Sequence, residues 1–255
     1  MMYYRKLENK QSDEWIVLLH GLCGNTAMWA QQIFTFNKHY NILLLDLPGH
    51  GNSTNAVIEN NIKDMSDVAR VIIDIMDENN IKKAHFAGVS LGTIVAAKIS
   101  ILYPERVSSI ILCGAVIGTT ILDTIKSETL KLCSKIMKPL TVAQLWVDFF
   151  LDKGERKYSR SLFVEGSKKL TKHDLITWIR MAAQEGKILL DVDYKNTNIY
   201  FIMGENDHVF LKEVQKLKEK IKTFKLTVIE DCGHVCNMQK PEIYNDLLLN
   251  YIGTI

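Results

Sequence analysis

The sequence predicts an α/β fold in which a mostly parallel sheet carries helices on both faces. Short apolar runs bounded by turn residues alternate with segments whose apolar residues recur at helical spacing. Strands that alternate with helices need crossover connections, and such connections produce parallel sheets that are covered on both sides. A length of 255 residues is enough for a sizeable core, and we expect one large domain rather than two small ones.

Six apolar runs are the predicted strands of this sheet, and a seventh segment is a predicted edge strand. The six runs span 15–19, 41–45, 84–87, 108–113, 199–203 and 226–229, and the edge strand spans 2–7. Predicted helices lie between or after them at 62–78, 91–103, 211–221 and 241–251. The lysine-rich stretch 212–225 overlaps one of these helices, so we interpret it as the solvent-exposed face of an amphipathic helix.

The alternation of strands and helices stops between Gly118 and about Asp193, where the pattern predicts helix after helix. Thr171 and Asp174 have the spacing of a capping box that begins a helix, and Gly186 can end that helix. We interpret 119–193 as a helical lid inserted between two parts of the core, 1–118 and 194–255. Most of its large apolar side chains are expected to pack against the core, and the remainder to line an apolar substrate pocket. These side chains are Leu122, Ile125, Leu145, Trp146, Phe149, Phe150, Phe163, Trp178 and Met181.

Charge and cysteine usage exclude several classes of protein. Lys and Arg number 31 against 29 Asp and Glu, and a net charge of +2 is too small to indicate a nucleic-acid partner. The five cysteines are odd in number and scattered, which fits reduced thiols and a cytoplasmic location. No apolar run approaches membrane-spanning length, so we expect no membrane association. The sequence does not determine the oligomeric state.

The stretch Gly88-Val89-Ser90-Leu91-Gly92 has the form Gly-x-Ser-x-Gly and lies between a predicted strand and a predicted helix. Glycines at both flanks let the backbone turn sharply enough to hold a serine at the end of the strand. Ser90 is therefore the candidate nucleophile. A serine hydroxyl becomes reactive when a base takes its proton, an acid orients that base and backbone donors meet the developing oxyanion.

Candidates for these further parts each follow a predicted strand. The glycine-rich loop His20-Gly21-Leu22-Cys23-Gly24 follows the first core strand, and the backbone N–H groups of Leu22 and Leu91 are the expected oxyanion donors. Asp207 is the candidate acid and His234 the candidate base. Because the carboxyl ends of parallel strands meet at one edge of the sheet, we expect these groups to lie together there.

These motifs resemble those of the α/β-hydrolase fold family, and in particular its lid-bearing serine esterases. The layout is similar to that of carboxylesterases, enol-lactonases and cofactor-free haloperoxidases, and the chain order serine, aspartate, histidine is that of the family. Two further motifs carry the resemblance: Asp46-Leu47-Pro48-Gly49-His50-Gly51-Asn52-Ser53 after the second core strand, and Gly233-His234 followed by Lys240-Pro241-Glu242. The resemblance covers nearly the whole chain except the lid, and it implies an α/β-hydrolase fold.

Three positions distinguish this chain within the family. Thr93 stands where many relatives have a glycine or an alanine, so more room is needed behind the turn, although no reacting group is lost. Carbon-carbon bond hydrolases of the family often carry asparagine beside the serine, where this chain has Val89, which places them lower among the expected activities. Dehalogenases and epoxide hydrolases of this fold carry aspartate in place of Ser90, which argues against both.

The assignments of acid and base have alternatives. His50 or His208 could supply the base instead of His234. Asp46 also follows a strand and could replace Asp207, although in the family pattern the aspartate at that place mainly fixes its own loop. Asp231, beside the candidate base, is more typical of a solvated turn.

Cys232 and Cys236 flank His234 and raise the alternative of a metal site. A structural zinc needs four tetrahedral ligands, and it would occupy the ring that the base requires. We therefore expect both cysteines to fill small apolar gaps, and we expect neither a metal nor an organic cofactor.

Motifs and resemblance together predict a serine hydrolase that cleaves a carboxylic ester or related acyl bond of a small to medium, partly apolar substrate through an acyl-enzyme. Alternatives are a lactonase, a perhydrolase or haloperoxidase, a carbon-carbon bond hydrolase, or a ligand-binding or signalling protein that turns over slowly or not at all. Met28 and Trp29 are candidate substrate contacts, but core packing is the alternative that we expect more often for such residues. The full set of candidate contacts is His20, Met28, Trp29, Trp146 and Phe150.

Overall fold

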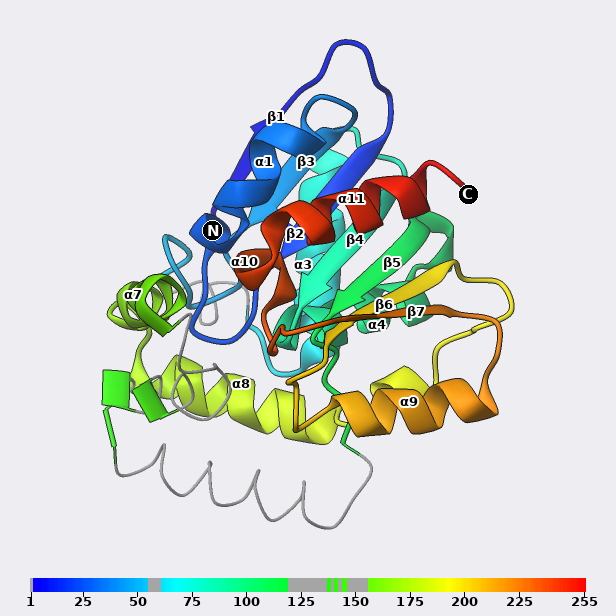
Figure 1. The fold of residues 1–255 in the computed structure, drawn as a ribbon. Helices are drawn as coiled ribbons and strands as arrows, with labels where there is room; N and C mark the ends of the chain where they lie inside the picture. The colour runs from blue at the N-terminus through cyan, green and yellow to red at the C-terminus, as the bar shows by residue number, and fades with distance from the viewer. Residues whose placement is uncertain (1, 55–60, 119–136, 139, 142–143, 146–155) are drawn as a thin grey trace.

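The computed structural model describes residues 2–54, 61–118, 137–138, 140–141, 144–145 and 156–255. At its centre lies a seven-stranded sheet in the order β1-β3-β2-β4-β5-β6-β7 (Figure 1). The edge strand β1 pairs antiparallel with β3, and every other neighbouring pair is parallel, as predicted. The strands are β1 Tyr4–Leu7, β2 Trp15–Leu19, β3 Asn41–Leu45, β4 Ala84–Val89, β5 Val107–Cys113, β6 Ile199–Gly204 and β7 Lys225–Ile229.

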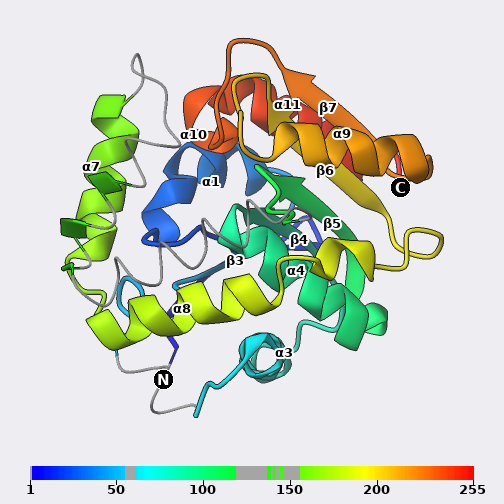
Figure 2. The ribbon, with the colours of Figure 1, turned by 90° about the horizontal axis from the view of Figure 1, so that it is seen from below.

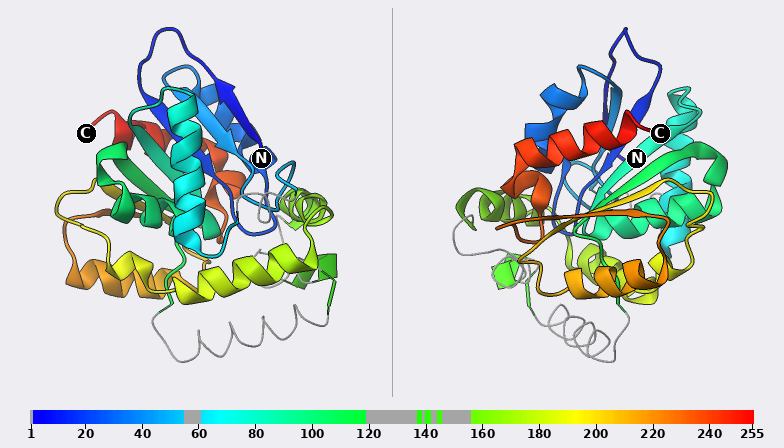
Figure 3. Two further views of the ribbon diagram at one scale, coloured as in Figure 1. Left: turned by 180° about the vertical axis from the view of Figure 1, so that it is seen from behind. Right: turned by 45° about the vertical axis from the view of Figure 1, so that its right-hand side comes forward.

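Helices cover both faces of the sheet. α1, α10 and α11 lie on one face, and α3 and α4 lie on the other (Figure 2). The view from behind in Figure 3 shows α3 in front of the sheet and α8 running across its end. The helices are η1 Thr26–Trp29, α1 Ala30–Phe36, α3 Met65–Glu78, α4 Leu91–Leu102, η2 Pro104–Arg106, α7 Arg156–Ser167, α8 Lys172–Gln184, η3 Ile188–Leu190, α9 Leu211–Lys220, α10 Cys236–Gln239 and α11 Pro241–Ile252.

The central strands are apolar along their whole length because both faces of the sheet are buried. In β2, Ile16 and Leu18 pack among the residues of α1, α10 and α11, whereas Val17 and Leu19 pack among those of α3 and α4. Successive side chains of a strand point to opposite faces, so a sheet covered on both sides needs apolar residues at every position. The same continuous apolar runs predict the strands from the sequence.

The observed elements differ from the predicted ones mainly at their ends. β4 continues two residues beyond the predicted 84–87, because Gly88 and Val89 still pair with Leu112 and Cys113 of β5. The helix α10, which begins two residues after His234, was not predicted, since four residues are too few to show a helical period.

Two helices of the predicted lid lie in the described part of the chain, α7 and α8. The predicted capping box is confirmed: the Thr171 side chain accepts from the Asp174 N–H, and the Asp174 carboxylate accepts from the Thr171 N–H. Trp178 and Met181 are buried in the core on the α3 and α4 side, whereas Leu145 is exposed. The boundaries of the lid stay a prediction. Leu122, Ile125, Trp146, Phe149 and Phe150 lie outside the described residues.

The part of the lysine-rich stretch that lies in α9 forms its outer face, as predicted, whereas Lys222 follows the helix and Lys225 begins β7. Val214 and Leu217 of this helix are buried, while Lys212, Lys216 and Lys220 are exposed. Among the helices that the structure describes, none has both the length and the apolar character needed to cross a membrane.

Asp64 sets the start of α3, three residues later than the apolar period predicts. Its side chain accepts from the N–H groups of Ser66 and Asp67, which are among the first N–H groups of the helix and have no acceptor within it.

Replacing Asp64 with alanine is expected to lower the free energy of unfolding by about 1 kcal/mol, because two backbone donors lose their acceptor. In a chain of this length, that loss corresponds to a decrease in Tm of roughly 2–4 °C, measurable by circular dichroism. Asp74→Ala is the matched control, since it removes the same charge from an exposed position of the same helix, where the carboxylate pairs with Arg70 at 3.4 Å. A decrease of equal size in both variants would contradict the capping role.

Candidate active site

Ser90 lies in the sharp turn between β4 and α4, with backbone angles of φ 52° and ψ −115°. Such a conformation is costly for a residue with a side chain, and it persists only where the surroundings impose it. A Cβ on Gly88 would lie 2.4 Å from the carbonyl oxygen of Gly92, and a Cβ on Gly92 would lie 2.2 Å from that of Leu19. Both glycines of the motif are therefore required by the close approach of backbone segments.

Ser90, His234 and Asp207 form one hydrogen-bonded chain at the carboxyl ends of β4, β7 and β6, which we call the Ser–His–Asp array. The Oγ of Ser90 lies 2.9 Å from Nε2 of His234, and Nδ1 of His234 lies 2.8 Å from Oδ2 of Asp207. All three side chains are buried. With an ionised carboxylate on one side, the neutral imidazole donates through Nδ1–H, and its Nε2 accepts from the serine hydroxyl.

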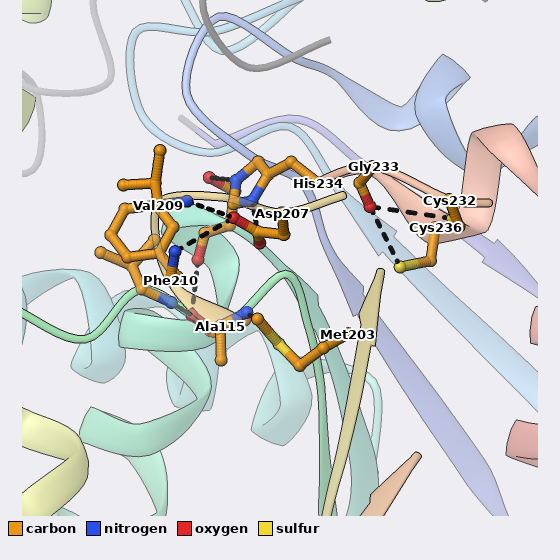
Figure 4. Close-up of polar contacts among 12 residues, drawn as sticks. Ala115, Met203, Asp207, Val209, Phe210, Cys232, Gly233, His234 and Cys236 are labelled. Atoms are coloured by element: carbon orange, nitrogen blue, oxygen red, sulfur yellow. Dashed lines mark hydrogen bonds and ion pairs between the residues drawn. The ribbon is translucent and has the colours of Figure 1, made fainter. Parts of the chain in front are cut away.

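The carboxylate of Asp207 is surrounded by donors. Its Oδ1 accepts from the N–H groups of Phe210 at 3.1 Å and Val209 at 3.3 Å (Figure 4). Burial by itself raises the pKa of this carboxyl, but the charge and hydrogen bond of His234 and the two N–H groups together hold the pKa below its ordinary value. An ionised Asp207 fixes the tautomer of His234 that can accept the proton of Ser90.

The two expected oxyanion donors lie in segments that adjoin Ser90. A Cβ on Gly21 would lie 3.2 Å from the Cβ of Ser90 and 3.9 Å from its Oγ, and Leu22 is the next residue of this loop. The N–H of Gly24 closes the turn onto the carbonyl of Gly21 at 3.0 Å. Leu91 is the first residue of α4, and the first N–H groups of a helix have no acceptor within it.

His20 fastens the beginning of the glycine-rich loop and is not placed to contact a substrate. The ring is fully buried; its Nδ1 donates to the carbonyl of Gly21 at 2.8 Å, and its Nε2 accepts from the N–H of Leu47 at 2.8 Å. Both nitrogens are thus used by the neutral ring, and burial lowers the pKa of His20 to about 4. The prediction of a substrate contact at His20 is replaced by a role in holding the loop.

The other candidate substrate contacts also lie away from an open surface or outside the described residues. Met28 and Trp29 are buried in the core with α10 and α11, where the ring of Trp29 lies 6.3 Å from that of Tyr244. Core packing, the alternative for these two residues, is what the structure shows. Trp146 and Phe150 lie outside the described residues.

Asp46 and His50, an alternative acid and an alternative base, lie in surroundings that differ from those of the Ser–His–Asp array. Asp46 accepts from the N–H groups of Thr26 and Asn52, so its carboxylate holds its own loop against the glycine-rich loop. The ring of His50 is fully buried between those of His20 and Trp178, at 5.1 and 5.5 Å.

The remaining two alternatives are surface residues. His208 is exposed, and so is Asp231, which occupies a turn at φ 49°. Of the three candidate bases, it is His234 that the structure places between a serine hydroxyl and a buried carboxylate.

Cys232 and Cys236 pack beneath the array. The sulfur atoms of both lie near the carbonyl of Gly233, at 3.7 and 3.6 Å (Figure 4). Hydrogen bonds with the thiols of Cys113 and Cys232 raise the pKa of Cys236 well above its ordinary value, so it is a protonated, buried thiol. In the part of the chain that the structure describes, no group of three or more histidine, cysteine or acidic side chains could hold a metal ion.

Two residues next to the array escaped the sequence prediction. Gly114 has φ 54°, and a Cβ there would lie 2.2 Å from the carbonyl oxygen and 3.0 Å from Nδ1 of His234. Its position directly after a predicted strand is the sequence feature that could have identified Gly114 as part of the site. The ring of Phe210 lies 5.4 Å from that of His234, and no sequence motif marks it.

Comparison with known proteins supports the resemblance stated from the motifs. A family model described as alpha/beta hydrolase fold matches residues 14–127. A curated relative, the 2-hydroxy-6-oxononadienedioate/2-hydroxy-6-oxononatrienedioate hydrolase of Escherichia coli K12, is 26% identical over 258 residues, which cover 95% of this chain and 88% of the relative.

Several solved structures share the fold. The enol-lactonase from Burkholderia xenovorans LB400 has a TM-score of 0.82 and 17% identity, over 99% of this chain and 96% of its own. The esterase EaEST from Exiguobacterium antarcticum has a TM-score of 0.83 and 20% identity, over 99% of this chain and 95% of its own. MenH from S. aureus has a TM-score of 0.82 and 18% identity, over 100% of this chain and 99% of its own. The predicted α/β-hydrolase fold is confirmed.

Burial of neutral His20 is expected to make the protein less stable in mild acid. Its folded pKa of about 4 lies below the ordinary 6.5, so the unfolded chain binds the proton more readily between these values, and the free energy of unfolding falls as the pH is lowered from 6.5 to 4. For His20 alone the loss is about 3 kcal/mol at pH 4. Urea unfolding at several pH values should therefore show a smaller acid-induced loss in His20→Gln than in the unmodified protein.

His39→Gln, at an exposed position, is the control for the loss of a histidine. An acid-induced loss of the same size in His20→Gln and in the unmodified protein would show that His20 is not held neutral by the fold.

Proposed function

Because the chain has the α/β-hydrolase fold, we propose that it is a serine hydrolase that cleaves a carboxylic ester or a related acyl bond of a small to medium, partly apolar substrate. The observation that carries the proposal is the Ser–His–Asp array, whose two contacts of 2.9 and 2.8 Å connect a serine hydroxyl to a buried carboxylate through one imidazole. This arrangement can move a proton away from the hydroxyl as it attacks.

In the proposed acylation step, the Oγ of Ser90 attacks the acyl carbon and its proton passes to Nε2 of His234. Asp207 stabilises the imidazolium that forms, because its carboxylate already accepts the Nδ1–H bond and has a lowered pKa. The imidazolium then gives the proton to the leaving group, and the acyl-enzyme remains on Ser90.

Charge on the attacked oxygen would be met by the N–H groups of Leu22 and Leu91. Gly21, next to Leu22, and Leu91 itself both adjoin Ser90, which supports this assignment. Loss of one such donor typically costs about 10²- to 10³-fold in rate. In the second half of the reaction, a water molecule attacks the acyl carbon and gives a proton to Nε2 of His234. The imidazolium then returns a proton to the Oγ of Ser90 as the acyl–Oγ bond breaks and the carboxylic acid leaves.

The side chains beside the array support a partly apolar, uncharged acyl group. The ring of Phe210 lies against His234, and half-buried Leu22 and Phe163 pack with the apolar residues that join the glycine-rich loop to α7 and α8. The chemistry needs no cofactor, since nucleophile, base and donors all come from the chain. We propose a small molecule as the substrate.

A fluorophosphonate probe tests the nucleophile directly, because it forms a covalent bond with an activated serine and releases fluoride. The unmodified protein is expected to be labelled rapidly, and Ser90→Ala not at all. Ser109→Ala is the matched control, since Ser109 also lies 2.8 Å from a histidine nitrogen, that of His85, but is fully buried. A folded, unlabelled native protein would overturn the proposal and favour a ligand-binding role.

Substrate size is tested with p-nitrophenyl esters of increasing acyl length, with kcat/KM as the measurement. Short and medium acyl chains are expected to give the highest values. Turnover of only long-chain or strongly charged esters would contradict the small, partly apolar substrate.

A carbon-carbon bond hydrolase is the second candidate, because the curated relative at 26% identity is the 2-hydroxy-6-oxononadienedioate hydrolase. The dienedioate that names this relative carries two carboxylates, and recognition of carboxylates usually relies on arginine or lysine. The apolar side chains beside the array and Val89 next to Ser90 support ester cleavage instead.

The two candidates are separated by measuring kcat/KM for the dienedioate, from the loss of its ultraviolet absorbance, and for a p-nitrophenyl ester. We expect the ester to be the better substrate, and no turnover of either by Ser90→Ala. The reverse ranking would establish the carbon-carbon bond activity.

A further inference from the structure

Thr93, at the position where many relatives have glycine or alanine, makes two hydrogen bonds that those residues cannot make. Its hydroxyl donates to the carbonyl of Ser90 at 2.6 Å and accepts from the N–H of Val116 at 3.2 Å. The first bond is common for a helical threonine, which often bonds a carbonyl one turn earlier. The second joins α4 to the segment that leaves β5. The side chain of Thr93 is fully buried.

These two bonds form a closed ring with a third bond at the turn. The N–H of Ser90 donates to the carbonyl of Cys113 at 3.0 Å. Both polar backbone groups of Ser90 are therefore connected to the segment 113–116, the N–H directly and the carbonyl through Thr93. Because the backbone of Ser90 is strained, it depends on such external contacts to keep its conformation.

The same segment supports the base of the array. Gly114 packs so closely on His234 that a Cβ there would lie 2.2 Å from the carbonyl oxygen of His234. The N–H of Gly114 donates to the carbonyl of Ile202 at 3.1 Å, and the N–H of Ala115 contacts the sulfur of Met203 at 3.3 Å (Figure 4). The segment 113–116 is thus fixed to β6 on one side and contacts His234 on the other.

We propose that Thr93 is a positioning residue, which sets the distance between Ser90 and His234 by fastening the serine turn to the segment 113–116. Its effect on catalysis rests on the proposed function. Without the hydroxyl, the N–H of Val116 loses its acceptor, and the carbonyl of Ser90 keeps only the backbone N–H of Thr93, at 2.9 Å, as a donor. The turn can then relax away from His234, and misplacement of a nucleophile slows reaction more than it weakens substrate binding.

Thr93→Val and Thr93→Ser test the proposal, because valine keeps the shape without the hydroxyl and serine keeps the hydroxyl. With p-nitrophenyl acetate as the substrate, Thr93→Val is expected to lower kcat about 10- to 100-fold and to change KM less than about twofold. Thr93→Ser is expected to stay within about threefold of the native kcat. Should Thr93→Val fail to fold, Thr93→Ala provides the variant without a hydroxyl.

Ser100→Ala is the matched control. Ser100 lies in the same helix, is buried, and donates to the carbonyl of Ala97 at 2.8 Å, but this bond stays within α4. Native kcat in Ser100→Ala supports the specific role of Thr93. A loss of kcat in this control equal to that in Thr93→Val, or an equal loss in Thr93→Ser, would overturn it.

Amide hydrogen exchange at Val116 provides a readout that does not depend on activity. Exchange is expected to be faster in Thr93→Val than in the native protein and unchanged in Thr93→Ser, because only the valine removes the acceptor. If the native protein does not react with the fluorophosphonate, the proposed function has failed. Amide exchange at Val116 then still tests whether Thr93 connects the serine turn to the segment 113–116. Native kcat or native Val116 exchange in a folded Thr93→Val variant would refute the inference.

Discussion

The strained backbone of Ser90 is the constraint on which the site depends. A residue at φ 52° and ψ −115° keeps this conformation because its N–H and carbonyl are both bonded and because glycines 88 and 92 let neighbouring backbone approach it. The parallel sheet brings the acid and the base to this turn, since β6 and β7 end at the same edge of the sheet as β4. Serine, acid and base therefore meet through the ends of rigid strands, although they are far apart in the sequence.

Environment assigns different roles to chemically identical side chains. His20 and His234 are both buried, but His20 is bonded to two backbone groups and burial lowers its pKa, whereas His234 lies between a hydroxyl and a carboxylate. Asp46 and Asp207 differ in the same way: the first accepts only backbone donors among its described contacts, and the second also accepts from an imidazole. Hydrogen-bond partners, rather than burial, therefore distinguish the members of the Ser–His–Asp array from the other buried histidine and aspartate.

The sequence predicted the strands and the three members of the array, and it did not predict how they are held. Continuous apolar runs reveal buried parallel strands. Asp207 and His234 could be named because each lies within five residues of the end of such a strand, at the edge where the site forms. The hydrogen bond of His20 with Leu47 and that of Thr93 with Val116 each join segments more than twenty residues apart. Such contacts follow from packing, and spacing along the chain does not contain them.

The segment that contains α7 and α8 packs directly against the glycine-rich loop that adjoins Ser90. Leu22 and Cys23 of this loop pack with Leu170, Leu175 and Ile179, which lie after α7 and within α8. A Cβ on Gly166 of α7 would lie 2.2 Å from the carbonyl oxygen of Cys23, so the helix and the loop are in direct backbone contact. Sequence changes in α7 and α8 therefore also act on the glycine-rich loop that adjoins Ser90.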